Sequence, residues 1–299
     1  MTQTGPLVSV IIPAYHSSAT LPACLEALRN QRYPRFETIV VNSSPEDDEF
    51  RQIRAKYPQI SFIQSPVRLF PHAARNRGAA EACGELLVFT DPDCTAHADW
   101  LENLVRAYQR GCSVLVGAMA LHAHTWWERG IHLTKYHWLL PGLPASHRKC
   151  APTANTAYAR SLWERIGPFD GEYFAGDGML SWRAMQSEYM PQFVPEAIVS
   201  HYHGNALASF CQQRFWRGAE YAKVRYMKQD GVLPRLSLLF SWATLPWVLL
   251  RAGRDAWRAK WMLAFAATLP IQILGHALWA CGESCWMWRA LLGKRERKP

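Results

Sequence analysis

The chain has 299 residues, enough for one large α/β domain with an appendage or for two modest domains, and its 49% hydrophobic and 19% charged residues exclude an intrinsically disordered protein. The formal net charge of +9 favours anionic partners such as nucleotide phosphates or an anionic membrane surface. No nucleic-acid binding is expected, because the basic residues are scattered except for a basic tail of Lys294, Arg295, Arg297 and Lys298.

Apolar runs that predict strands alternate with helical segments in the first part of the chain. Strands are predicted at residues 7–13, 38–41, 60–63, 85–90 and 113–116, and helices at 21–30, from Pro71 to Gly84 and at 100–108. This alternation predicts an α/β fold with a mainly parallel sheet covered on both faces. Ligands of such sheets bind at the carboxyl ends of strands, and Asp91 directly follows the strand at 85–90.

Residues 121–152 show no clear period and are rich in aromatic residues and histidine, which predicts an ordered loop. Helices are then predicted from Ser161, at 176–186 and at 207–227, with a strand at 192–200.

The composition changes after Pro234. Two apolar runs at 236–250 and 261–281 flank a basic segment at 251–260, and Trp, Arg and Lys crowd their ends, as at membrane interfaces. We expect hydrophobic helices embedded in a membrane or bound at its surface; a soluble helical cap and an oligomer interface are the alternatives. The sequence therefore predicts two domains. Residues 1–232 form the catalytic domain, and residues 233–299 form a helical region that is membrane-associated or hydrophobic.

Eight cysteines occur without a CxxC pair, and the chain opens with a polar stretch, so reduced thiols in a cytosolic setting are expected. We interpret Cys94, beside an acidic motif, as a small filler residue; a catalytic residue is the alternative.

Asp91 and Asp93 are carboxylates two residues apart, with Pro92 turning the chain between them. Hard divalent cations bind such oxygen ligands and bridge them to substrate phosphates. After an apolar strand, this pair predicts a metal site; a solvated turn is the alternative.

Three segments in this order resemble the family-2 glycosyltransferases, which have the GT-A fold: residues 9–15 (SVIIPAY), 74–80 (ARNRGAA) and 84–93 (GELLVFTDPD). The resemblance covers about residues 7–230. It implies transfer of a sugar from a nucleotide-diphosphate sugar, with Mn²⁺ or Mg²⁺ held at Asp91 and Asp93.

The resemblance also implies a donor-binding set of Pro13, Ala14, Tyr15, Asn42, Arg75 and Asp91. Family members usually carry an aspartate where this chain has Asn42, so the base preference is open. Asp47 or Asp48 would compensate, or would only cap a helix. A surface ion pair is the alternative for Arg75.

Residues 174–183 (FAGDGMLSWR) resemble the segment that supplies the family's general base, which implies that Asp177 takes the acceptor's proton in an inverting transfer. A plain helix cap is the alternative. Gly176 replaces the family's acidic neighbour.

His201 follows the strand at 192–200 where relatives have a histidine that completes the metal site, and it is favoured over His203; a histidine that binds no metal is the alternative. Residues 212–218 (QQRFWRG) lack the Q-x-x-R-W motif of processive synthases, so addition of a single sugar is expected. Arg214 and Arg217 would contact donor phosphates or a membrane surface.

The acceptor side is less defined. Trp126, Trp127, Trp138 and Trp163 would stack on sugars or pack in the core, and Asn155 would bind the acceptor or donor sugar. We expect a carbohydrate or lipid-linked acceptor, in surface polysaccharide or glycolipid synthesis at the cytoplasmic face of the inner or plasma membrane. A nucleotidyltransferase, which the missing G-x-x-x-x-G-K loop disfavours, and a non-catalytic membrane-bound nucleotide-sugar-binding protein are the alternatives.

Overall fold

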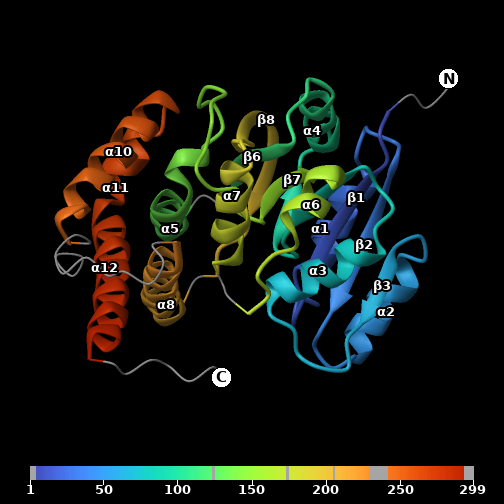
Figure 1. Ribbon diagram of the computed structural model, residues 1–299, viewed down its shortest axis with the longest axis horizontal. Coiled ribbons are helices and arrows are strands. Elements are labelled where there is room, and N and C mark those ends of the chain that lie inside the picture. The colour runs from blue at the N-terminus through green and yellow to red at the C-terminus, as the bar shows by residue number, and fades with distance from the viewer. Residues whose placement is uncertain (1–4, 123–124, 173–174, 205, 229–241, 293–299) are drawn as a thin grey trace. The chain divides into compact units, whose positions relative to one another are not determined.

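The computed structural model describes residues 5–122, 125–172, 175–204, 206–228 and 242–292. The chain folds into two compact units, one of Met1–His122 with Pro144–Tyr202 and one of Ala123–Leu143 with His203–Pro299 (Figure 1). The predicted domain division at residue 232 falls outside the described residues and stays a prediction.

The first unit is built on an eight-stranded sheet of order β3-β2-β1-β4-β7-β6-β8-β5. Its strands are β1 (Val8–Ala14), β2 (Phe36–Asn42), β3 (Ser61–Gln64), β4 (Leu86–Thr90), β5 (Cys94–Ala96), β6 (Val114–Leu121), β7 (Asn155–Ala159) and β8 (Gln192–His201). β1 to β4 pair in parallel, as do β6 and β8, while β7 runs antiparallel to β4 and β6, and β5 antiparallel to β8. The predicted α/β fold with a mainly parallel sheet is confirmed; β5 and β7 were not predicted.

Helices lie along this sheet. They are α1 (Leu21–Arg29), α2 (Asp48–Lys56), α3 (Pro71–Glu81), α4 (Trp100–Gln109), α6 (Arg160–Ile166) and α7 (Gly176–Gln186). α3 packs closely on β1 because its Gly78 has no side chain: a Cβ there would lie 2.6 Å from Ile11 Cγ2. This close packing fixes α3 beside the carboxyl ends of the central strands.

An aromatic cluster supports β4 from one face. Phe89, which is fully buried, contacts Tyr158, Trp163 and Phe169, with ring centroids 5.1 to 6.4 Å apart. Trp163 is therefore a core residue, and the suggestion that it stacks on a sugar is wrong.

The second unit is helical. It contains α5 (Trp126–Tyr136), the short 3₁₀ helix η1 (His137–Leu139), α8 (Leu207–Lys228), α10 (Leu245–Arg258), α11 (Met262–Ala267) and α12 (Leu269–Leu291). α12 packs along α8 through two glycines, since a Cβ on Gly218 or Gly282 would collide with the backbone carbonyl of Trp279 or Phe215.

The prediction of a loop over 121–152 is wrong in part, because α5 lies within it. Thr125 caps this helix: its hydroxyl accepts a hydrogen bond from Glu128 N at 3.2 Å and donates one to Glu128 Oε2 at 2.7 Å. Aromatic and histidine residues on both faces of α5 hide its helical period in the sequence.

The C-terminal apolar runs form helices, as predicted, over the residues that the structure describes; residues 236–241 and the basic tail lie outside them. Within the described part of the chain, every helix is too short or too polar to span a bilayer. The prediction of membrane-embedded helices therefore has no support there.

Candidate active site

The parallel pairing of β1 with β2 and β4 brings the carboxyl ends of these strands together. Pro13 and Ala14, two predicted donor-binding residues, are buried at the end of β1, and Ala14 O accepts a hydrogen bond from Ser43 N. Tyr15 follows them and is exposed, with the Arg68 guanidinium 4.6 Å from its ring centroid. Of these three residues, Tyr15 is the one that presents its side chain to solvent.

Arg75 lies inside the first unit and pairs with Asp91. Its side chain is only 3% exposed, and its guanidinium donates a hydrogen bond to Asp91 Oδ1. The interpretation of Arg75 as a surface ion-pair residue is therefore wrong. Arg77, on the opposite side of α3, is 61% exposed and lies 3.8 Å from Glu81.

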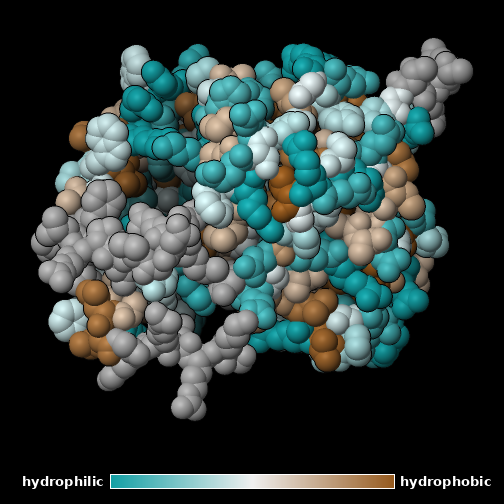
Figure 2. Space-filling model, in the orientation of Figure 1, coloured by the Kyte–Doolittle hydropathy of each residue, from teal (hydrophilic) through white to brown (hydrophobic). Residues whose placement is uncertain are grey.

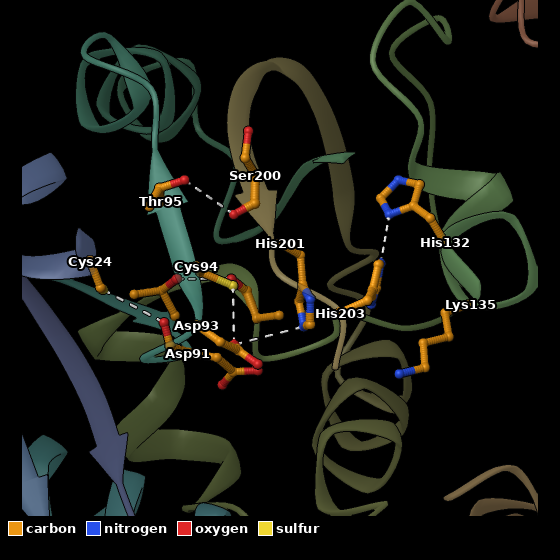
Figure 3. Close-up of polar contacts among 12 residues, drawn as sticks. Cys24, Asp91, Asp93, Cys94, Thr95, His132, Lys135, Ser200, His201 and His203 are labelled. Atoms are coloured by element: carbon orange, nitrogen blue, oxygen red, sulfur yellow. Dashed lines mark hydrogen bonds and ion pairs between the residues drawn. The ribbon is translucent and has the colours of Figure 1, made fainter. Parts of the chain in front are cut away.

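Asp93 lies beside His201 at the edge of the sheet (Figure 3). Antiparallel pairing of β5 with β8 places Cys94 opposite His201, and His201 Nε2 is 3.8 Å from Asp93 Oδ1. Tyr202 N donates a hydrogen bond to Asp93 O at 2.9 Å, which fixes the turn that carries the carboxylate.

These residues fit a divalent cation. One ligand atom each from Asp93, Cys94 and His201 lie within 4.8 Å of one another. Asp93 is 36% exposed, so its carboxylate can face a substrate. Asp91 is not part of this group, and its Oδ1 is engaged by Arg75.

Cys94 was interpreted from the sequence as a filler residue, and the structure places its sulfur 3.8 Å from Asp93 Oδ1. Burial raises the pKa of its thiol well above the usual value, and the charges of Asp93 and Asp91 raise it further. Only the pairing of β5 with β8, which the sequence did not predict, brings this thiol to His201.

The side chain of Asn42 is fully engaged within the first unit. Its amide NH₂ donates to Ser44 O and Gln64 Oε1, and its oxygen accepts from Ser44 N and Ser44 Oγ, at 2.7 to 3.2 Å. An asparagine amide forms about four hydrogen bonds, and Asn42 makes four inside the first unit. In this conformation Asn42 holds the turn after β2, and its contact with the base or ribose of the donor stays a prediction. Asp47, offered as a compensating residue, caps α2 instead, accepting from Phe50 N at 2.8 Å.

Asp177 lies in the first turn of α7 and is 7% exposed. Its Oδ1 accepts a hydrogen bond from Gly178 N at 2.8 Å, while the N-cap position itself belongs to Ala175. The carboxylate therefore lies at the N-terminal end of α7, within hydrogen-bond distance of a first-turn backbone NH.

Gly176 has a steric explanation. A Cβ at this position would lie 2.7 Å from Asp170 O and 2.8 Å from the His72 ring, so no acidic side chain fits there. The departure from the family pattern reflects local packing.

Several predicted acceptor contacts are not supported. Asn155 is 1% exposed; it accepts a hydrogen bond from Trp100 Nε1 and donates two to the carbonyls of Ala118 and Ala197, so its predicted role in binding a sugar is wrong. In the second unit, Trp127 packs against Phe210, the indole of Trp138 donates to Lys135 O, and Trp126 is 52% exposed.

Two arginines and a histidine of the second unit were also considered in the sequence, and of these Arg217 is exposed. Arg214 is 5% exposed, donates to Gly275 O at 3.1 Å and lies over the Trp279 ring, which places it inside the helical unit. His203 lies 3.1 Å from His132, between Nε2 and Nδ1.

Comparison with known proteins matches residues 9–166, more than half of the chain, to the model of glycosyl transferase family 2. The chain is 28% identical over 260 residues to glycosyltransferase AglE of Haloferax volcanii, covering 84% of this chain and 82% of that protein. It is 28% identical to the probable glycosyltransferase YdaM of Bacillus subtilis (79% of this chain, 60% of YdaM). It is 25% identical to the pre-mycofactocin glycosyltransferase of Mycobacterium tuberculosis (82% of this chain, 53% of that protein).

Two solved structures share the fold. The mannosyltransferase PcManGT from Pyrobaculum calidifontis, in complex with GDP-Man and Mn²⁺, aligns over 98% of this chain and 89% of its own, with a TM-score of 0.62 and 18% identity. GalNAc-T7 with UDP, GalNAc and Mn²⁺ aligns over 68% of this chain and 44% of its own, with a TM-score of 0.55 and 16% identity. The chain is thus an enzyme of the family-2 glycosyltransferases with the GT-A fold.

Proposed function

We propose that this enzyme transfers a single sugar from a nucleotide-diphosphate sugar to an acceptor hydroxyl, with inversion and with the help of a divalent metal. The observation that carries the proposal is the group formed by Asp93, Cys94 and His201 at the edge of the sheet. The two structures of the same fold, which contain a nucleotide or nucleotide sugar and Mn²⁺, support it.

In this proposal Asp93 and His201 hold Mn²⁺ or Mg²⁺. Such a metal neutralises the charge of the departing nucleoside diphosphate. Arg75 is a positioning residue, because its buried guanidinium holds and orients the Asp91 carboxylate. Asp91 keeps its second oxygen for the donor.

Asp177 is the proposed general base. The acceptor oxygen attacks the anomeric carbon, the bond from that carbon to the diphosphate oxygen breaks, and the hydroxyl proton passes to the Asp177 carboxylate. The departures from the family pattern at Asn42 and Gly176 are the features that favour the non-catalytic alternative. The close packing of Gly176 against Asp170 O gives the missing acid a steric explanation, which weakens that alternative.

We further propose a carbohydrate or lipid-linked acceptor used in surface polysaccharide or glycolipid synthesis, and a location at the cytoplasmic face of the inner or plasma membrane. Single-sugar addition follows from the lack of Q-x-x-R-W at residues 212–218. The basic, tryptophan-rich C-terminal helices support the location.

A screen of nucleotide sugars by thermal denaturation tests the donor site. A donor at about 100 times its Kd stabilises a protein by roughly 2.7 kcal/mol, a rise in Tm of about 5 to 10 °C. The rise should require Mn²⁺ or Mg²⁺ and should vanish in chelator, in Asp93→Asn and in His201→Gln. Asp99→Asn and His97→Gln, which change the same residue types just beyond the site, are the controls. Stabilisation that is equal with and without metal overturns the metal proposal.

The base is tested separately. Asp177→Asn should keep donor binding but slow transfer by about 10²- to 10⁴-fold. Full transfer activity in this variant would exclude Asp177 as the base, and no turnover of any donor by the unchanged enzyme would favour a protein that only binds nucleotide sugars.

A further inference from the structure

The last segment that the structure describes, residues 242–292, exposes many large apolar side chains. We call this set the C-terminal surface: Trp242, Trp247, Leu250, Trp257, Met262, Leu263, Ile273, Leu274, Trp288, Leu291 and Leu292. The side chains of Leu263, Leu250 and Trp257 are 90%, 70% and 69% exposed. A monomeric soluble protein rarely exposes a large contiguous apolar patch, and such a patch marks an interaction surface, so the arrangement of these side chains on one helix face decides their meaning.

The exposed charges on the same segment are all positive. Between Trp242 and Leu292, the exposed charged residues are Arg251, Arg254, Arg258, Lys260 and Arg289. The two acidic residues of this segment are buried: Asp255 Oδ2 lies 3.0 Å from His137 Nδ1, and Glu283 Oε1 lies 2.6 Å from Arg225 Nη2. The surface therefore presents apolar groups and cations, and no exposed anion.

α10 shows how the two kinds of side chain are combined. At 100° per residue, Trp247, Leu250 and Trp257 fall within about 80° of one another around the helix. Of the three arginines of α10, Arg254 lies within this arc, and Arg251 and Arg258 lie just beyond one end of it. The opposite face of the helix, which carries Ala252 and Ala256, is buried. Tryptophan and leucine beside arginine on one exposed face is the pattern of a helix that lies in the plane of a membrane interface. Figure 2 shows brown and teal residues intermixed over the α10–α12 region.

We propose that the C-terminal surface binds the headgroup region of an anionic lipid bilayer without crossing it. The absence of spanning helices among the described residues agrees with an attachment parallel to the membrane. A second copy of the chain fits poorly, because a symmetric contact would place cationic surfaces against each other. The inference deepens the proposed membrane location and is independent of the sugar chemistry.

Co-sedimentation of the full chain with vesicles tests the proposal. Binding is expected to vesicles that contain phosphatidylglycerol and to be at least tenfold weaker to pure phosphatidylcholine, and it should weaken as salt is raised. Replacing two cations, Arg258→Gln with Lys260→Gln, should lower the partition coefficient about 30-fold, since each cation near an anionic surface contributes about fivefold.

The apolar part is tested with the charge-conserving variant Trp257→Gln with Leu263→Gln, which also should lower binding at least tenfold. This variant keeps the basic tail. If the tail alone recruits the chain to vesicles, the variant should bind as strongly as the unchanged chain, and that result would overturn the proposal. Val67→Gln with Arg29→Gln, on exposed positions of the first unit, is the matched control. Hydrogen exchange in α8 and α12 should be the same in every variant, which separates loss of binding from loss of fold.

Other results decide against the surface as a membrane site. Equal binding to neutral and anionic vesicles, no binding to either, or a stable dimer broken by the Trp257 and Leu263 substitutions would each overturn it. The vesicle assay contains no donor or acceptor. A negative result in it therefore leaves the proposed transferase function untouched, and a failure to detect sugar transfer leaves the result on membrane binding valid.

Discussion

The pairing of Arg75 with Asp91 predicts an asymmetry between two substitutions. Asp91→Ala removes the anion that pairs with the Arg75 guanidinium, and the Arg75 side chain is only 3% exposed. Removing one partner of a buried ion pair costs about 3 to 5 kcal/mol. Arg75→Met leaves the Asp91 carboxylate, which is 27% exposed and can be hydrated, so the cost should be about 1 to 3 kcal/mol.

The structure gives a further reason for the larger loss. Arg75 Nε is buried without a hydrogen-bond partner, so the guanidinium depends on the contact with Asp91. The double variant Arg75→Met with Asp91→Ala buries no charge. It should therefore be more stable than Asp91→Ala alone, with a coupling of about 2 kcal/mol.

Hydrogen exchange as a function of urea, followed in peptides that cover α3 and β4, is the suitable assay. Global unfolding of a chain with two compact units is not a single two-state transition, whereas these peptides report the first unit, and peptides of α12 serve as an internal reference. If Asp91→Ala costs no more than Arg75→Met, or if the two losses add in the double variant, the pair does not stabilise Arg75.

Three further predictions follow from local packing and burial. Gly176→Ala should lower the free energy of unfolding of the first unit by about 1 to 3 kcal/mol, because its Cβ would lie 2.7 Å from Asp170 O. Gly204→Ala lies in the second unit, with none of the described atoms within 4 Å of its Cβ, and should leave hydrogen exchange of both units unchanged. Asn155→Leu should cost roughly 3 kcal/mol or more by the same assay, because two buried carbonyls and one indole NH lose their partner; a loss under 1 kcal/mol would refute this. Burial lowers the pKa of His276 from 6.5 to about 3, with help from nearby positive charge, so the unfolded chain takes up this proton first and the second unit should lose stability as the pH falls from about 6.5 towards 3. His276→Gln should make the urea midpoint of α12 peptides less dependent on pH in that range, and an unchanged slope would show that other groups govern it.

The central strands could be predicted from the sequence because they are buried on both faces. β1, β2 and β4 are almost continuous apolar runs, and their order with the intervening helices gave the parallel sheet. The positions of Asp91 and Asp93 after β4 followed from the same pattern. The boundaries of α7 and the start of α3 at Pro71 also agree with local sequence rules.

Two of the short strands, β5 and β7, could not be predicted in this way. β5 has three residues and β7 five, and neither forms a distinctive apolar run. Their pairing depends on partners that are distant in sequence, such as His201 opposite Cys94. α5 was missed because helix formation there depends on a capping pair and on packing against α12, where Gly130 closely approaches Ile271.

The sequence by itself determined the family, the sheet type and the acidic motif, since these are encoded by local patterns of apolar, glycine and acidic residues. Only the tertiary structure decided which polar groups remain available to a ligand. In the folded chain the amides of Asn42 and Asn155 form hydrogen bonds with other protein groups, and Arg75 is buried against Asp91. Folding also brings Cys94 and His201 next to Asp93. The physical reason is that a polar group forms its hydrogen bonds with whichever partners folding brings within about 3 Å. Several of these partners are distant in the sequence, as Gln64 is from Asn42 and Ala197 from Asn155, and His201 is likewise distant from Asp93.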